Sequence, residues 1–129
     1  MAVSPGDQIL ASIQLVNGTS NQWTMNMNDT TSDTSFQGTF NYSSSQLSAE
    51  WIVERPTVNG SLRALADFGN VTFTSCYASV GSITGVINSF PWNAVAIYSS
   101  ATSPPTQLTD VSELTSDGGG FTVTYLPSG

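Results

Sequence analysis

The residues best suited to chemistry in this 129-residue sequence are two glutamates in the stretch Ala49-Glu50-Trp51-Ile52-Val53-Glu54. As a β-strand, this stretch would place Glu50, Ile52 and Glu54 on one face, with Trp51 and Val53 on the other. The Cα atoms of the two glutamates would be roughly 13 Å apart, at about 3.3 Å per residue. Because this separation is too large for a shared proton, Glu50 would act alone or with a partner from another strand. The alternative interpretation is that both glutamates only make the surface soluble.

Several kinds of active site are excluded because the sequence has no histidine and no lysine, and has one cysteine, Cys76. A Ser-His-Asp triad, a Cys-His pair, a Ser-Lys dyad and a Schiff base are therefore impossible within the chain. Histidine-ligated zinc and a thiolate metal site are excluded as well. Gly118-Gly119-Gly120 is not followed by the Lys and Ser/Thr of a phosphate-binding loop, so we interpret it as a turn. We expect no metal and no cofactor.

The charge balance favours tolerance of acid. The sequence has nine acidic residues, and its basic side chains are two arginines, Arg55 and Arg63. Carboxylates have reference pKa values near ~4, so near pH ~3 most of them would be protonated and the chain would stay close to neutral. Two arginines are too few for a phosphate-neutralising patch or for attraction to anionic lipid. We therefore expect neither a nucleic-acid partner nor a membrane partner.

Other features point to an extracellular location. No apolar run approaches the roughly 20 residues of a membrane-spanning helix, and we interpret Met1-Ala2 as the start of a mature segment. Five triplets have the pattern of N-glycan acceptors, although a chain rich in Asn, Ser and Thr produces some by chance. They begin at Asn17, Asn28, Asn41, Asn59 and Asn70. Together with the absence of lysine, they favour a secreted protein.

The elements that would position Glu50 follow from alternation with period two, which is typical of half-buried strands. Residues 8–16 and 22–28 are expected to form a hairpin around Asn17-Gly18. Further strands are predicted at residues 36–42, 49–54, 62–68, 71–77, 94–98, 108–114 and 120–126. No segment has a helical period. The sequence therefore predicts one all-β domain over residues 1–129, an antiparallel sandwich or barrel.

The stretch at residues 49–54 is similar to the signature around the catalytic glutamate of the glutamic peptidases, the eqolisin family G1 of acid endopeptidases. Other pieces of that family recur here in similar order: Val3-Ser4-Pro5-Gly6-Asp7, Leu65-Ala66-Asp67-Phe68-Gly69, Val71-Thr72-Phe73 and Val123-Thr124-Tyr125. The resemblance covers nearly the whole chain and corresponds to the C-terminal portion of longer members. It implies a concanavalin-like two-sheet β-sandwich, which would be incomplete in this chain, together with secretion, activity in acid and no metal.

The resemblance also implies a mechanism in which a glutamate activates water and a glutamine amide stabilises the oxyanion. The matching glutamate is Glu50, with Trp51 and Glu54 as its neighbours in the site. The family segment that carries the glutamine has no counterpart here. Gln8 does not match by position, nor does any other glutamine: Gln14, Gln22, Gln37, Gln46 or Gln107. The signature is often followed by Asp-Phe, where this chain has Arg55-Pro56.

Two functions remain open from the sequence. The first is an acid endopeptidase, or its glutamate-bearing part, that cleaves protein or peptide substrates and draws its glutamine from a partner chain or another segment. The second is a non-catalytic sandwich that binds peptide or carbohydrate, or that associates with a second copy through unpaired strand edges. Trp23, Trp51 and Trp92 would be core or loop anchors, or an aromatic platform. Of these, Trp92 in Phe90-Pro91-Trp92 is the best candidate for binding.

Overall fold

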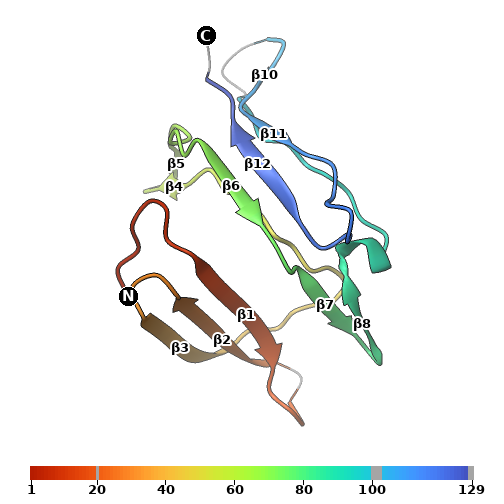
Figure 1. Ribbon diagram of the computed structural model, residues 1–129. Coiled ribbons are helices and arrows are strands. Elements are labelled where there is room, and N and C mark those ends of the chain that lie inside the picture. The colour runs from red at the N-terminus through yellow and green to blue at the C-terminus, as the bar shows by residue number, and fades with distance from the viewer. Residues whose placement is uncertain (20, 100–102, 128–129) are drawn as a thin grey trace. The chain divides into compact units, whose positions relative to one another are not determined.

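The structure is a computed structural model that describes residues 1–19, 21–99 and 103–127. The chain divides into two compact units, residues 1–48 and residues 49–129 (Figure 1). Each unit is built from antiparallel strands, so the all-β prediction is confirmed within each of them. No helix among the described residues is long and apolar enough to cross a membrane.

The first unit is a three-stranded antiparallel sheet of β1 (Ile9–Leu15), β2 (Gln22–Asp29) and β3 (Thr34–Asn41), in that order. These strands confirm the hairpin and the third strand predicted from alternation. Gly18 has a φ of 77°, a left-handed conformation that glycine adopts at no steric cost in the turn after β1. The turn is closed by the N–H of Val16, which donates to the carbonyl of Gln22 at 2.8 Å.

The register of this sheet separates an apolar face from a polar face. The apolar face places Met25 opposite Ile13 and Met27 opposite Phe36. Gly38 lies between Phe36 and Phe40, whose ring centroids are 6.5 Å apart. A Cβ on Gly38 would lie 2.6 Å from the Phe40 ring, so the glycine leaves the space that the ring occupies.

The polar face carries a row of hydrogen bonds that crosses all three strands. The Gln37 amide donates to the Asn26 side-chain oxygen at 2.7 Å, and the Asn26 amide donates to the Ser12 hydroxyl at 3.2 Å. Because Ser12 and Asn26 are register partners, as are Asn26 and Gln37, the row joins directly opposed residues. Cross-strand pairs of this kind help to fix the register of a sheet.

The largest sheet of the second unit contains β11 (Thr109–Val111), β12 (Phe121–Tyr125) and β6 (Asn70–Phe73), with β12 in the centre. Phe121 is paired with Phe73, and their rings stack with centroids 4.9 Å apart. The buried apolar residues of the described chain all lie in this unit: Leu65, Cys76, Ile87, Leu108 and Val123. The central strand β12 therefore supplies part of the core through Val123.

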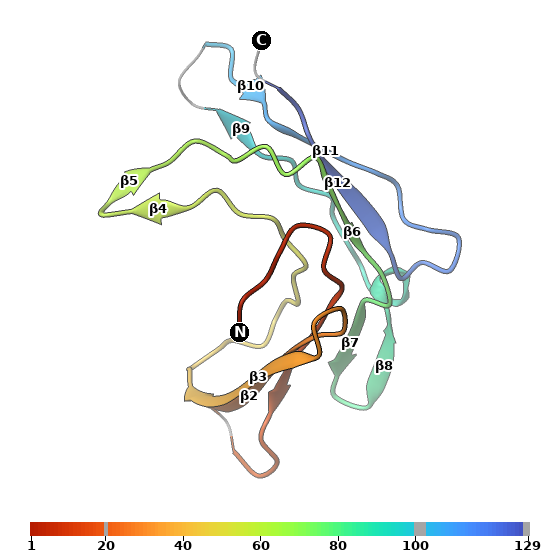
Figure 2. The same cartoon turned by 60° about the vertical axis from the view of Figure 1, so that its left-hand side comes forward.

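The described part of the second unit also contains three two-stranded antiparallel pairs. They pair β4 (Thr57–Val58) with β5 (Ser61–Leu62), β7 (Tyr77–Val80) with β8 (Ile83–Val86), and β9 (Tyr98–Ser99) with β10 (Thr106–Gln107). Among the described residues of this unit, one 3₁₀ turn is present: η1 (Ile87–Ser89), which follows β8. Figure 2 shows the β4–β5 hairpin extending away from the sheet that contains β6.

Several strands predicted in the second unit differ from those observed. Residues 49–54, predicted to be a strand, lie in a stretch from residue 42 to residue 56 that has no strand or helix. Of residues 62–68, only Leu62 is in a strand. The prediction for 71–77 is divided between β6 and β7, because Ser75 has a φ of 52° and turns the chain. Residues 94–98 and 108–114 also form shorter strands than predicted, whereas 120–126 is confirmed as β12.

Candidate active site

Glu50 lies near the start of the second unit, in the segment whose exposure alternates as the sequence predicts. Glu50, Ile52 and Glu54 are exposed, while Trp51 and Val53 are half-buried. The structure therefore keeps both carboxylates on the solvent side and separates them from Trp51. The predicted division into two faces is observed, although the segment forms no strand.

The C-terminal end of this segment is joined to the base of the β4–β5 hairpin. The Arg55 guanidinium donates through Nε to the carbonyl of Arg63, and the N–H of Arg63 donates to the carbonyl of Pro56 at 2.9 Å. Pro56 has no N–H and cannot extend a ladder of hydrogen bonds. The hairpin base thus fixes the point at which the Glu50 segment ends.

Two of the glutamines already have hydrogen-bond partners far from Glu50 in the sequence. The Gln37 amide belongs to the row across the first sheet. The Gln107 amide donates to the carbonyl of Thr109 at 2.8 Å, and its oxygen accepts from the Tyr98 hydroxyl at 3.2 Å. These contacts hold both side chains in place on their own sheets. The structure thus assigns Gln37 and Gln107 to contacts within their own units.

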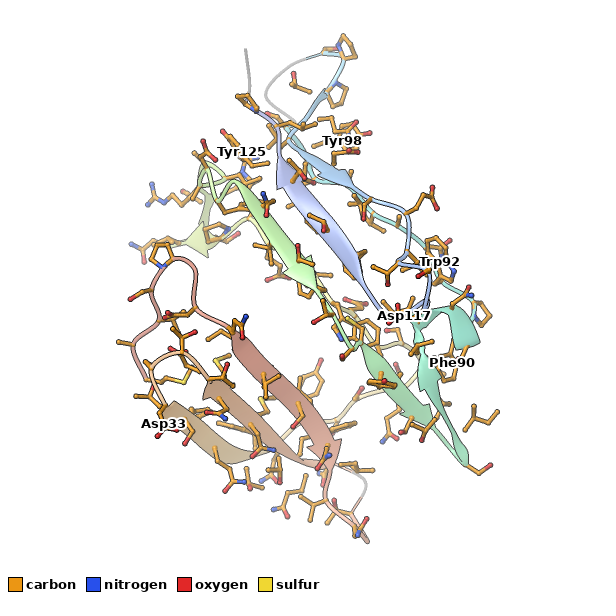
Figure 3. All side chains as sticks on the ribbon, in the orientation of Figure 1. Asp33, Phe90, Trp92, Tyr98, Asp117 and Tyr125 are labelled. Atoms are coloured by element: carbon orange, nitrogen blue, oxygen red, sulfur yellow. The ribbon has the colours of Figure 1, made fainter. Side chains whose placement is uncertain are left out.

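The three tryptophans differ in their surroundings. Trp23 is half-buried and donates through Nε1 to the carbonyl of Tyr42 at 2.9 Å, which is an anchoring role. Trp51 is half-buried and follows Glu50 in the sequence. Trp92 is 40% exposed and follows η1 and Phe90 in the second unit (Figure 3). It remains the tryptophan most open to a ligand.

A carboxylate of the first unit, Asp29, is fully buried at the end of β2. The Ser32 hydroxyl donates to one carboxylate oxygen at 2.6 Å, and the N–H groups of Thr31 and Ser32 donate to the other at 2.9 and 3.1 Å. The hydrogen bond from the Ser32 hydroxyl contributes most to holding the pKa of Asp29 below its usual range. The two N–H groups and the Asp7 side chain lower this pKa further, whereas burial raises it. Asp29 thus ties the β2–β3 loop to the sheet.

A second carboxylate, Asp117, lines a hollow of about 250 Å³ that was not predicted from the sequence. The Thr115 hydroxyl and the N–H of Gly119 donate to Asp117 Oδ1 at 2.5 and 3.1 Å, and the hydroxyl contributes most to lowering the pKa of this carboxyl. The hollow is lined by Thr74, Ser75, Thr115, Ser116, Asp117, Gly119 and Gly120. Figure 3 labels Asp117. The sequence feature that could have indicated this hollow is the pair Thr115-Ser116 shortly before the three glycines.

The glycine run beside this hollow forms a turn, as predicted. The N–H of Thr115 donates to the carbonyl of Gly120, and the N–H of Gly118 donates to that of Thr115, both at 2.8 Å. The carbonyl of Gly119 accepts from the N–H of Cys76 at 2.8 Å. This run therefore connects β11 to β12 and also anchors the chain ahead of β7.

Comparison with known families decides what kind of protein this is. The model of the peptidase A4 family matches residues 1–125, a range that includes Glu50 and crosses both units. The chain belongs to this family. The resemblance to the eqolisin glutamic peptidases is thereby confirmed.

A sequence match and a crystal-structure match, both from Aspergillus niger, extend this result. Aspergillopepsin-2 is 36% identical over 87 residues, which are 65% of this chain and 30% of that protein. The crystal structure of aspergilloglutamic peptidase matches with a TM-score of 0.81 and 28% identity, covering 98% of this chain and 70% of the other. This match confirms the antiparallel β-sandwich fold of the eqolisins. The match to aspergillopepsin-2 covers less than a third of the length of that protein.

Proposed function

We propose that this chain is the glutamate-bearing part of an acid glutamic endopeptidase, with Glu50 as its general base and acid. The observation that carries the proposal is the peptidase A4 match over residues 1–125, within which Glu50 and Trp51 stand in a signature-like stretch. We also propose that both units belong to one domain, because this match runs across the boundary between them.

The proposed reaction is attack of water on a peptide carbonyl. Glu50 takes a proton from the water as its oxygen attacks the carbonyl carbon, and then delivers a proton to the leaving amine. A carboxylate suits this work in acid, since its reference pKa of about 4.3 lies where the enzyme would operate. A neutral amide can stabilise the tetrahedral oxyanion without ionising. Trp51 and Glu54 would border the site.

The complete site needs a glutamine amide that Gln37 and Gln107 do not supply in their present contacts. We propose that it comes from another segment or from a partner chain that completes the sandwich. We further propose a secreted location with protein or peptide substrates. The low lysine and arginine content supports activity in acid, because few positive charges remain when the carboxylates are protonated.

The test compares Glu50→Gln with Glu54→Gln in the protein at its natural length, using a denatured protein substrate between about pH 2 and pH 5. General acid–base catalysis contributes about 10²- to 10⁴-fold, so Glu50→Gln should lower kcat by at least roughly 100-fold. Glu54→Gln removes a carboxylate that borders the proposed site but transfers no proton, so it should lower kcat far less than Glu50→Gln does. If Glu50→Gln cleaves at the wild-type rate, Glu50 is not the general base.

One observation favours the non-catalytic alternative. Glu50 is exposed in this chain, whereas a water-activating carboxylate works best in a site that excludes bulk water. If the chain is a binding module, the wild-type protein should leave protein substrates uncleaved across the acid range. It would bind unstructured peptide with the same affinity when Glu50 is replaced by Gln.

A further inference from the structure

The five Asn-X-Ser/Thr triplets differ in how open their side chains are. An N-linked glycan is typical of a triplet on a surface loop of a secreted protein. The transfer joins the asparagine amide nitrogen to a sugar, so that nitrogen must be accessible. The hydroxyl residue two positions later is also part of the acceptor. Both side chains therefore need to be considered in each triplet.

Asn59 and Ser61 lie at the tip of the β4–β5 hairpin. Thr57 is paired with Leu62 and Val58 with Ser61, which leaves Asn59 and Gly60 as a two-residue turn. Their φ angles are 52° and 73°, as a type I′ turn requires, and asparagine tolerates this conformation well. Asn59, Gly60 and Ser61 are all exposed. Within the described chain, no hydrogen bond occupies the side chain of Asn59 or Ser61.

Three of the other triplets have an occupied hydroxyl. Thr19 donates to the carbonyl of Val16 at 2.7 Å, and Thr30 donates to that of Gln8 at 3.1 Å. The Thr72 hydroxyl is paired with that of Thr122 at 3.0 Å. These contacts belong to the triplets that begin at Asn17, Asn28 and Asn70. In the folded chain each of these three hydroxyls therefore already has a partner.

The remaining triplet begins at Asn41, the last residue of the edge strand β3. Asn41 is exposed but is held in the ladder opposite Gln22, so its backbone has strand conformation. Asn28 is constrained further, since it lies in the central strand β2 and lines a hollow of about 450 Å³. Asn59 thus combines a turn, exposure and two open side chains.

We propose that Asn59 carries an N-linked glycan when the chain passes through a eukaryotic secretory pathway. The Asn59 amide nitrogen would form a bond to the anomeric carbon of a lipid-diphosphate oligosaccharide, as the diphosphate leaves and the nitrogen loses a proton to the transferase. The inference rests on the proposed extracellular location and does not require peptidase activity.

The shape of the hairpin explains why a glycan would be useful there. The hairpin extends away from the β6 sheet, so no element of that sheet covers its tip (Figure 2). Val58 and Leu62 are 45% and 52% exposed on its two strands. An oligosaccharide at Asn59 would shield these apolar side chains from water and from other molecules.

The experiment expresses the chain with a supplied signal peptide in yeast and measures the mass of the peptide containing residue 59, in secreted and cell-retained protein alike. We expect an enzyme-removable glycan on wild type and its loss in Asn59→Gln and Ser61→Ala. The conservative Ser61→Thr variant should retain the glycan, and Asn28→Gln should leave the pattern unchanged.

An unmodified Asn59 in wild-type protein from both fractions would overturn the proposal, as would an unchanged glycan mass in Asn59→Gln. Glu50→Gln, expressed in the same way, should carry the same glycan as wild type. Failure of the glycan inference is therefore read from peptide mass, while failure of the proposed function is read from substrate cleavage.

Discussion

Replacing Val123 by alanine tests whether β12 forms the centre of the second unit. Val123 is 5% exposed and is paired with Val111 on one side and Val71 on the other. Losing two buried methyl groups costs about 1.6 kcal/mol, at about 0.8 kcal/mol for each. A residual cavity of roughly 40 Å³ would add about 1 kcal/mol. The total of about 2 to 3 kcal/mol corresponds to a fall in Tm of roughly 5 to 15 °C.

The matched control is Thr124→Ala, at the next residue of the same strand. Thr124 is exposed, so its replacement should change the free energy of unfolding by less than about 0.5 kcal/mol. Urea unfolding followed by circular dichroism would measure both variants against wild type. If the two substitutions lower stability equally, Val123 does not lie in a packed core, and the assignment of faces on β12 is wrong.

Other features of the structure lead to three further predictions. Gly120→Ala would place a Cβ 2.8 Å from the Phe73 carbonyl oxygen and should lower the free energy of unfolding, measured by thermal unfolding, by about 1 to 3 kcal/mol. Gly119→Ala should cost less, because its Cβ would come nearest to a side-chain atom, Val86 Cγ1 at 3.1 Å. Asp29 and Asp117 have lowered pKa values, so their stabilisation should be fully present above their usual pKa of 3.8 and be lost as the pH falls through the folded values. Replacing both by asparagine should therefore flatten the decline of Tm in acid, and an unchanged slope would contradict this origin. Cys76 is 3% exposed and burial raises the pKa of its thiol, so a thiol reagent should label it slowly in native protein and fully after unfolding, whereas rapid native labelling would show that the site opens.

Local signals predicted the first unit well. Strands β1, β2 and β3 alternate cleanly, are long and are joined by short turns, so each strand pairs with its sequence neighbour. The second unit was harder because β12 pairs with β6, almost fifty residues earlier, and alternation does not identify such partners. The β4–β5 hairpin has a turn signal in Asn59-Gly60, a pair that is also part of a glycan triplet.

The candidate site shows the same limit. Alternation correctly predicted that Glu50 and Glu54 share the exposed side and that Trp51 lies on the other. It could not predict whether the segment has a partner strand, because a strand also requires hydrogen bonds from a neighbour that the local sequence does not specify. Glu50 as the catalytic residue stays a prediction, to be decided by the activity of its glutamine variant.

The row formed by Gln37, Asn26 and Ser12 determines how the register of the first sheet responds to pH. None of its three side chains gains or loses a proton between strong acid and neutrality. Its two hydrogen bonds, at 2.7 and 3.2 Å, therefore need no ionised partner. A sheet fastened in this way keeps its register when neighbouring carboxylates change charge, as an ion-paired sheet would not.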